Sequence, residues 1–401
     1  MTRKNKLQTL DTSIPYQSIG LDLAKSDVAV AAIPTESTEP LLVDRLDYKE
    51  LYELAEKLEP TLFAMEPCCG YSMISTRLKN IGHQVKIISG LEVQSYVRNR
   101  LHNQKTDLND AIALAHLAND FNIPDIRAKE IQELRIATIQ TSRMQALQKA
   151  NSILVSFKGS CQNWGIALPR ATKSIKKLTE AVEKNAEMLG EQCVNALKKQ
   201  IQEYKSLKKD VDEFDQSLKS LVEADSRGKK IQEVLGIGTQ TTARLLTTIG
   251  DIRRFPNPRS FVAYYGCAPQ NLITGHKGTP KVRAGDQAIV PVFNRGQGKI
   301  ARNGDKLLRS LIMQCAACIY MFACKGQLVD CQLKAWLEKQ VESRKPYGKI
   351  IVSLAAKLLR IVWALLTYDR KFDLNRAGVS RGALAALNKA QRTKEAATTA
   401  A

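Results

Sequence analysis

Two acidic residues stand in apolar runs near the beginning of the chain. Asp22 lies inside the run Ile19-Gly20-Leu21-Asp22-Leu23, where an ionised carboxylate is costly unless it is paired or bound to a cation. Glu66 ends the apolar run Phe63-Ala64-Met65 and precedes Pro67, so it stands where a strand leaves its sheet. We therefore expect these two strand-borne acids to converge.

A second pair of acids opens a predicted helix. Thr106 fits the N-cap position, which places Asp107 in the first turn and Asp110 three residues later on nearly the same face. Both lie at the positive end of the helix dipole, and for either residue alone this complementarity is a sufficient explanation.

The four carboxylates in combination point to chemistry. A strand Asp, a strand-end Glu and two helical Asp supply the oxygen ligands that suit Mg²⁺ or Mn²⁺. Two such ions can activate an attacking oxygen and stabilise a leaving oxygen on a phosphodiester.

The segments that must position these acids predict a mixed α/β domain. Short β-type runs alternate with helical ones. The predicted strands cover residues 18–23, 28–33, 41–43, 62–65 and 84–88, and the predicted helices cover 48–58 and 71–81. Short links between the first three strands favour an antiparallel meander, which is how a ribonuclease-H-like domain begins.

Beyond Pro124 the apolar spacing becomes helical. A long helix is predicted from Ile131 to Phe157, with an interruption at 164–169. A 4-3-4-3 spacing typical of a coiled-coil seam follows at Leu207, Val211, Phe214, Leu218 and Leu221. A helical hairpin within one chain and a dimeric stalk would both bury this seam, and the spacing does not choose between them.

A glycine-rich turn follows a polar linker at Ser226–Lys230. The run Leu235-Gly236-Ile237-Gly238-Thr239 precedes a helical segment at 240–249 and predicts a hairpin entering a helix. Backbone amides at Gly236 and Gly238 would hold a phosphate without reading its sequence. The alternative is a turn that only caps the helix.

Composition favours a polyanionic partner. The 401 residues include 60 Lys and Arg against 40 Asp and Glu, a formal charge of +20, which points to nucleic acid before a membrane surface. The most apolar stretch, Ile350–Tyr368, is interrupted by Lys357 and Arg360 and predicts a buried helix rather than a membrane span. With no apolar run behind the basic N-terminus, we expect a cytoplasmic protein.

The cysteine pattern indicates reduced thiols. Nine cysteines are scattered along the chain, unlike the framework of a secreted disulfide protein. Cys315 and Cys318 form a CxxC without a second pair or a nearby His, so they are expected to be small buried residues rather than zinc ligands.

Taken together, these segments resemble the DEDD transposases of the insertion-sequence 110 family, which includes Piv-type invertases. The family's first-strand motif is met by Gly20-Leu21-Asp22-Leu23-Ala24-Lys25. Its Met-Glu element is met by Met65-Glu66-Pro67-Cys68-Cys69-Gly70, with one residue extra before the Gly, and its Lys-[Thr/Asn]-Asp-x-x-Asp-Ala element by residues 105–111.

This resemblance implies a domain order and a site. It implies a RuvC-like α/β domain at 18–126, coiled-coil helices at 127–226 and a mainly helical transposase domain at 227–375. Composition adds a flexible basic tail at 1–17 and predicts a disordered tail at 376–401, which is rich in Ala, Thr and Lys and has no apolar face. The resemblance makes Asp22, Glu66, Asp107 and Asp110 the ligands of Mg²⁺ or Mn²⁺, with Lys105 contacting a phosphate.

The nucleophile departs from the family pattern. The family uses a Ser immediately before a Gly, where this chain has Thr274-Gly275. A threonine hydroxyl can attack phosphorus, but its β-methyl crowds the approach. Either Thr274 is the nucleophile, or activity is reduced or lost. Ser260, at a predicted helix start, is the weaker alternative.

The resemblance also implies partners. The segment between Gly275 and Gly298 is longer than usual, and its Lys277, Lys281 and Arg283 would contact DNA or RNA unless they belong to an ordinary solvated loop. The protein would act as a homo-oligomer, a dimer or a tetramer, on donor and target DNA chosen by a bridge RNA. The rival functions are a RuvC-like nuclease that uses water and a non-catalytic nucleic-acid binder.

Overall fold

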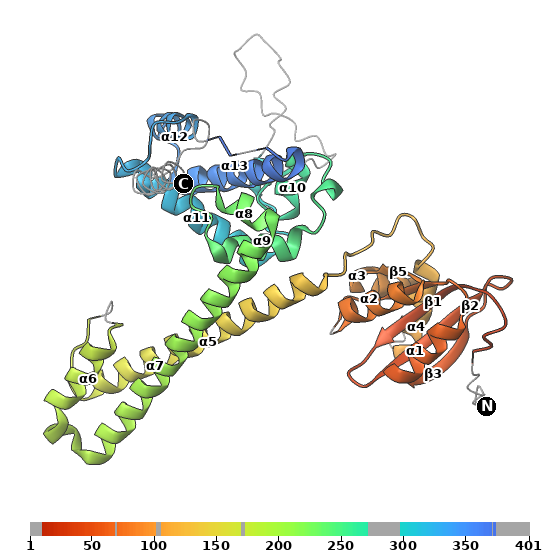
Figure 1. Ribbon diagram of the computed structural model, residues 1–401, viewed down its shortest axis with the longest axis horizontal. Coiled ribbons are helices and arrows are strands. Elements are labelled where there is room, and N and C mark those ends of the chain that lie inside the picture. Colours follow the sequence, from red (N-terminus) through yellow and green to blue (C-terminus); the bar gives the residue numbers. More distant parts are fainter. Residues whose placement is uncertain are drawn as a thin grey trace, which may run out of the picture. The chain divides into compact units, whose positions relative to one another are not determined.

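The computed structural model describes residues 10–68, 70–101, 106–169, 173–271, 297–370 and 372–373. The chain divides into two compact units, Met1–Leu134 and Arg135–Ala401, coloured red to orange and yellow to blue in Figure 1. Each unit has its own core and is described by itself.

The N-terminal unit contains a five-stranded sheet with the order β3-β2-β1-β4-β5. The strands are β1 Tyr16–Leu23, β2 Asp27–Pro34, β3 Leu41–Asp47, β4 Leu62–Met65 and β5 Gln84–Ile87. β1, β2 and β3 pair antiparallel, whereas β1, β4 and β5 run parallel. The predicted meander is confirmed, and the main difference is that β3 continues four residues beyond Val43, to Asp47.

Helices cover both faces of this sheet. α1 (Tyr48–Lys57) and α2 (Tyr71–Ile81) cover the face on which Leu21 and Phe63 are buried. α3 (Gly90–Arg100) and α4 (Asp107–Leu117) cover the opposite face, where Ala64 is buried. Sequence periodicity predicted α1, α2 and α4 but not α3, whose apolar stripe is narrow, with only Val93 and Val97 buried.

A close approach joins α4 to the central strand β1. A Cβ atom on Gly20 would lie 2.5 Å from the amide nitrogen of Ala115 and closer still to the carbonyl oxygen of Ala111. The buried hydroxyl of Ser18 donates to the carbonyl of Ala115 at 2.7 Å. Glycine at position 20 therefore lets the backbone of α4 pack directly on β1.

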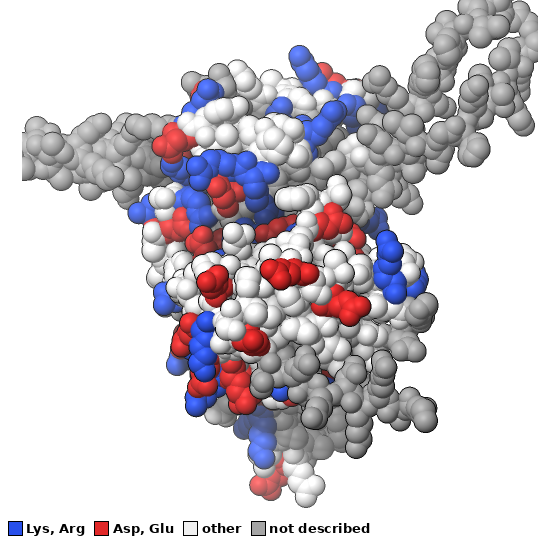
Figure 2. Space-filling model, turned by 90° about the vertical axis from the view of Figure 1, so that its right-hand side faces the viewer, with Lys and Arg blue, Asp and Glu red and all other residues white. Residues whose placement is uncertain are grey.

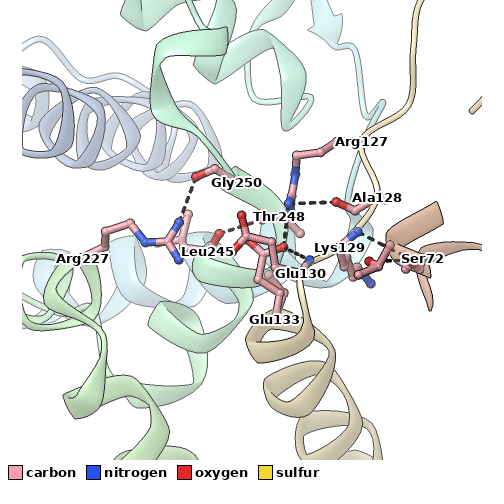
Figure 3. Close-up of polar contacts among 12 residues, drawn as sticks. Ser72, Arg127, Ala128, Lys129, Glu130, Glu133, Arg227, Leu245, Thr248 and Gly250 are labelled. Carbon is pink, nitrogen blue, oxygen red and sulfur yellow. Dashed lines mark hydrogen bonds and ion pairs between the residues drawn. The ribbon is translucent and has the colours of Figure 1, made fainter. Parts of the chain in front are cut away.

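The segment that leaves this unit is fastened to the sheet and to α2. The amide of Ile126 donates to Ile87 at 2.8 Å, and the amide of Lys129 donates to the Ser72 hydroxyl at 3.1 Å (Figure 3). Arg127 forms a 2.6 Å ion pair with Glu133, which is buried in the first turn of α5 (Ile131–Asn163).

Long helices open the second unit. α5 runs out to α6 (Ile175–Lys184), and α7 (Ala186–Ala224) returns along α5, with a non-helical residue at Gly190. Apolar residues from all three helices form one core, which includes Phe157, Leu178 and Ile201.

The predicted seam faces inward along α7. Val211 and Leu218 are buried, and Leu207, Phe214 and Leu221 are half-buried. Arg143 of α5 donates two hydrogen bonds to Asp215 of α7, at 2.6 and 3.0 Å. The packing is that of a helical hairpin within one chain, and a coiled coil stays a prediction.

The rest of the second unit is mainly helical around one large core. Its elements are α8 Ser226–Gln232, α9 Thr239–Ile249, the 3₁₀ turn η1 Ile252–Arg254, α10 Pro258–Tyr264, β6 Pro269–Asn271, β7 Gln297–Ile300, α11 Lys306–Cys324, α12 Gln332–Glu342 and α13 Tyr347–Tyr368. β6 and β7 pair antiparallel.

The predicted linker at Ser226–Lys230 is wrong, because this segment is the helix α8. Asp225 caps it by accepting from the amide of Arg227 at 2.8 Å. Gly228 is buried, and a Cβ there would collide with the carbonyl oxygen of Val222, so this glycine serves close packing rather than flexibility.

Two helices of this unit, α11 and α13, are long and apolar enough to cross a membrane by length and composition alone. α13 packs within the core, where Trp363 donates to the carbonyl of Phe255 at 3.1 Å, as predicted for a buried helix. On α11 the expectation of two buried cysteines is half right, since Cys315 is buried and Cys318 is exposed.

The close approach at Gly20 predicts a stability effect. Gly20→Ala should lower the free energy of unfolding by about 2 kcal/mol or more, because backbone atoms cannot yield to a methyl group. Gly159→Ala is the matched control: Gly159 lies on α5 with nothing within 4 Å of its Cβ position, and alanine there should raise stability by about 0.5–1 kcal/mol. Urea denaturation measures both, and equal effects would contradict the packing described.

Candidate nuclease site

Asp22 and Glu66 lie at the same end of the sheet, on neighbouring segments. β1 and β4 run parallel, and their last pair is Leu21 with Met65; Asp22 follows Leu21 in β1, and Glu66 is the first residue after β4. Side chains alternate between the faces of a strand, and Ser18 and Gly20 both contact α4. Asp22 and Glu66 therefore belong to the face that α4 covers, and both are half-buried.

The start of α4 lies over the same end of the sheet. Ser18 contacts Ala115 and Gly20 contacts Ala111, so α4 runs opposite to β1. From Gly20 to Asp22 the strand advances by two residues, which span about 6.6 Å. From Ala111 back to the first turn of α4 is one helical turn, which spans about 5.4 Å. This brings the first turn of α4, with Asp107 and Asp110, to the level of Asp22. The predicted acids thus share one end and one face of the sheet.

Contacts at both ends fix α4 in this position. The Thr106 side chain caps the helix by accepting from the amide of Asn109 at 3.1 Å, as predicted. At the other end the Lys86 ammonium donates to the carbonyls of Ala118 at 2.9 Å and Asp120 at 2.7 Å. A cation at the C-terminal carbonyls of a helix also complements its dipole.

A ring contact joins α4 to α3. The imidazole of His116 stacks on Tyr96 with ring centroids 5.6 Å apart. Burial lowers the pKa of His116, so the ring is neutral near pH 7 and serves packing.

The Glu66 carboxylate lies beside the beginning of α3. A Cβ on Gly90, the first residue of that helix, would be 3.1 Å from Oε2 of Glu66. The N-terminus of a helix favours a negative charge, so this position suits a carboxylate. Because Gly90 has no side chain, there is room beside it for the Glu66 carboxylate.

Asp107 is engaged by an arginine that the sequence did not single out. Arg45 Nη2 donates to Asp107 at 2.6 Å, and Nη1 donates to Asp27 at 3.1 Å. The prediction had ended the third strand at Val43, so Arg45 had no place in the sheet. The side chain of Asp107 is 55% exposed, whereas Asp110 is half-buried.

The donor set fits a hard cation in its chemistry. All four groups are carboxylates, which Mg²⁺ and Mn²⁺ prefer, and they come from two adjacent strands and the helix above them. Within the described ranges, no three His, Cys, Asp or Glu side chains are gathered closely enough to hold a metal ion. Of the four carboxylates, that of Asp107 is directed toward Arg45.

The two hairpin glycines have different surroundings. Gly236 has a φ of +79°, and a Cβ there would lie 2.9 Å from Ile319 of α11, so this residue is needed for packing. Gly238 caps α9, and nothing lies within 4 Å of its Cβ position. The turn therefore enters a helix as predicted, and of the two glycines Gly238 has the more open surroundings.

Of the remaining predicted residues, the structure describes only Ser260. Lys105, Thr274, Lys277, Lys281 and Arg283 lie outside the described residues. Thr274 follows β6 by three residues. Ser260 is described: its amide is capped by Asn257 at 2.9 Å and its hydroxyl donates to the Asn257 carbonyl at 2.7 Å, which confirms the helix start.

The positive charge of the chain does not form one continuous field on the face shown in Figure 2. There Lys and Arg side chains are interspersed with Asp and Glu. The excess of 20 positive charges is a property of the whole sequence.

Comparison with known proteins covers both units. A DEDD-type transposase model matches residues 19–154, and the transposase model of the IS116/IS110/IS902 family matches residues 228–290. The first match contains all four predicted carboxylates, and the second contains the glycine turn and Thr274.

Similar proteins extend along most of the chain. The transposase of insertion sequence element IS1328 from Yersinia enterocolitica is 27% identical over 88% of this chain and 98% of its own length. The transposase of IS1111A from Coxiella burnetii is 23% identical over 88% and 90%. The pilin gene-inverting protein of Moraxella bovis is 22% identical over 73% and 75%. With both family models matched in order and similar transposases along most of its length, the chain is similar to the IS110 family of DEDD transposases.

Proposed function

We propose that this protein is a metal-dependent DNA recombinase that cuts and rejoins the ends of an insertion sequence. The observation that carries the proposal is the parallel pairing of β1 with β4, since Asp22 and Glu66 each come one residue after its last pair, on the face that α4 covers. The strand order β3-β2-β1-β4-β5 agrees with a ribonuclease-H-like nuclease domain.

Four carboxylates would hold Mg²⁺ or Mn²⁺ in this proposal: Asp22, Glu66, Asp107 and Asp110. When bound, such ions neutralise charge on a phosphodiester and lower the cost of forming the attacking oxyanion. The strands and α4 are fixed by Gly20, Thr106 and Lys86, so binding requires rotation of carboxylates rather than movement of the sheet.

The nucleophile in this proposal is the hydroxyl of Thr274. Its Oγ forms a bond to the phosphorus of a DNA strand while the bond from phosphorus to the 3′-oxygen breaks. The 3′-oxygen takes up a proton as the threonine loses one, which leaves a 5′-phosphothreonine. Attack by the 3′-hydroxyl of another strand reverses these steps and restores an intact phosphodiester.

The proposed partners follow from the charge and from the family. Donor and target DNA are the substrates, a structured bridge RNA selects them, and a homo-oligomer brings the carboxylates of one subunit to the hydroxyl of another. The excess of basic residues supports phosphate partners of either kind. The cytoplasm, where DNA is accessible in a bacterium, is the proposed location.

A second candidate is DNA inversion without a guide RNA. It is favoured by the similarity to the pilin gene-inverting protein of Moraxella bovis. Both candidates use the same carboxylates and hydroxyl, and they differ in the need for RNA.

Removing one strand-borne carboxylate tests the metal-dependent step. Asp22→Asn and Glu66→Gln keep the side-chain size but lose the charge, and each should lower Mg²⁺-dependent strand cleavage by about 100-fold or more. Cleavage of end-labelled element DNA measures this. Glu53→Gln on the exposed face of α1 is the control and should cleave normally. Normal cleavage by the Asp22 and Glu66 variants would contradict the role of these carboxylates in catalysis.

Trapping identifies the nucleophile. Denaturing electrophoresis of the protein with labelled DNA should show a covalent adduct that is lost in Thr274→Ala and kept in Ser260→Ala. Thr274→Ser should form the adduct faster, because it removes the β-methyl that crowds the approach to phosphorus. Cleavage without any adduct would instead indicate a nuclease that uses water.

Ribonuclease treatment separates guided recombination from simple inversion. The protein purified from a host that carries the whole element should contain bound RNA, and digestion of that RNA should abolish strand exchange. Adding back the extracted RNA should restore exchange, which excludes damage to the protein. Full activity after complete digestion would favour the inversion mechanism.

A further inference from the structure

A β-bulge on β3 turns Arg45 toward the carboxylates. Val28 pairs with Leu46 and Val30 pairs with Val43, so two residues of β3 stand opposite Ala29 of β2. Such an extra residue changes which face the following side chains occupy. Leu42 accordingly packs with Ala29 and Ala111 under α4, while Leu46 packs in the core on the opposite face.

Arg45 stands in the same row as Asp22. Ala29 pairs with Asp22 of β1 on one side and faces the bulge on the other. Arg45 is therefore two strands from Asp22, about 10 Å at the usual spacing. Its contact with Asp107 shows that its side chain is on the α4 face, which is the face of Asp22 and Glu66.

The guanidinium joins two acids at once. Nη1 lies 3.1 Å from Asp27 of β2 and Nη2 lies 2.6 Å from Asp107 of α4, so its planar fork fixes the direction of the Asp107 carboxylate. Asp27 is in turn contacted by the hydroxyl of Ser26 at 3.1 Å. Arg45 is thereby anchored on the sheet at Asp27 while it holds Asp107.

We propose that Arg45 is an exchangeable counter-ion of Asp107, which a divalent cation must displace before Asp107 can become its ligand. The inference rests on the proposed metal site. Without a bound cation, the arginine compensates the charge of Asp107 and directs its carboxylate toward β3. Arg45 is thus a positioning residue that lowers the affinity of the site for metal.

The expected effect is modest, because both partners are about half exposed. Exposed ion pairs of this kind change an equilibrium by about two- to fivefold, and dissolved salt weakens them. Arg45→Ala should therefore bind Mn²⁺ about two to five times more tightly than the natural chain at low ionic strength. Arg45→Lys keeps the charge but cannot reach both acids with a planar fork, so it should fall between the two.

The experiment is a titration of the full-length protein with MnCl₂. Binding is measured by calorimetry and by the electron paramagnetic resonance signal of free Mn²⁺. Lys57→Ala is the matched control, since it removes one positive charge from the end of α1, which leads into the opposite end of the sheet. It should bind Mn²⁺ as the natural chain does. Circular dichroism and thermal unfolding verify that each variant is folded.

Asp22→Asn separates the two proposals. If the natural chain binds Mn²⁺, Asp22→Asn loses that binding and Arg45→Ala strengthens it, both proposals are supported. If Asp22→Asn loses binding but Arg45→Ala binds no more tightly than the natural chain, the role of Arg45 is overturned and the metal site stands. If Asp22→Asn binds as the natural chain does, or the natural chain binds no Mn²⁺, the metal site is overturned and the role of Arg45 with it.

Discussion

The contact between the backbones of β1 and α4 at Gly20 is the constraint on which the candidate site depends. It requires a residue without a side chain in the strand, because the carbonyl of Ala111 and the amide of Ala115 occupy the space of a Cβ. With α4 packed there, its first turn stands above the end of β1. The parallel pairing of β1 with β4 ends at Leu21 and Met65, and Asp22 and Glu66 each follow this last pair by one residue. Three separate stretches of sequence, β1, the end of β4 and the start of α4, are thus positioned by the close contact at Gly20.

Two of the four carboxylates lie beside positive groups of the protein. Glu66 lies beside the start of α3, and Asp107 is held by Arg45 at the bulge of β3. Each contact compensates a negative charge with a group of the protein itself, a helix dipole in one case and a guanidinium in the other. In the proposed mechanism, cation binding would therefore be an exchange of partners.

Much of this arrangement could be predicted from local patterns. Short apolar runs located β1 and β4, and the Thr106 cap located α4, because these signals lie within a few neighbouring residues. Arg45 could not be found in this way, since a bulge is set by pairing between strands and not by the strand's own sequence. Ser226–Lys230 looked like a linker because Gly228 suggests flexibility, whereas its lack of a side chain serves contact with Val222. Thr274 and Lys105 stay predictions from the family pattern.

The central claim is that Asp22 and Glu66 form one cation site beneath α4, and anomalous X-ray scattering from crystals grown with Mn²⁺ tests it most directly. The account predicts an anomalous peak within about 2.3 Å of carboxylate oxygens of both residues, with Asp107 turned away from Arg45 toward the ion. Manganese bound elsewhere, with Asp22 and Glu66 lacking a shared peak, would contradict it.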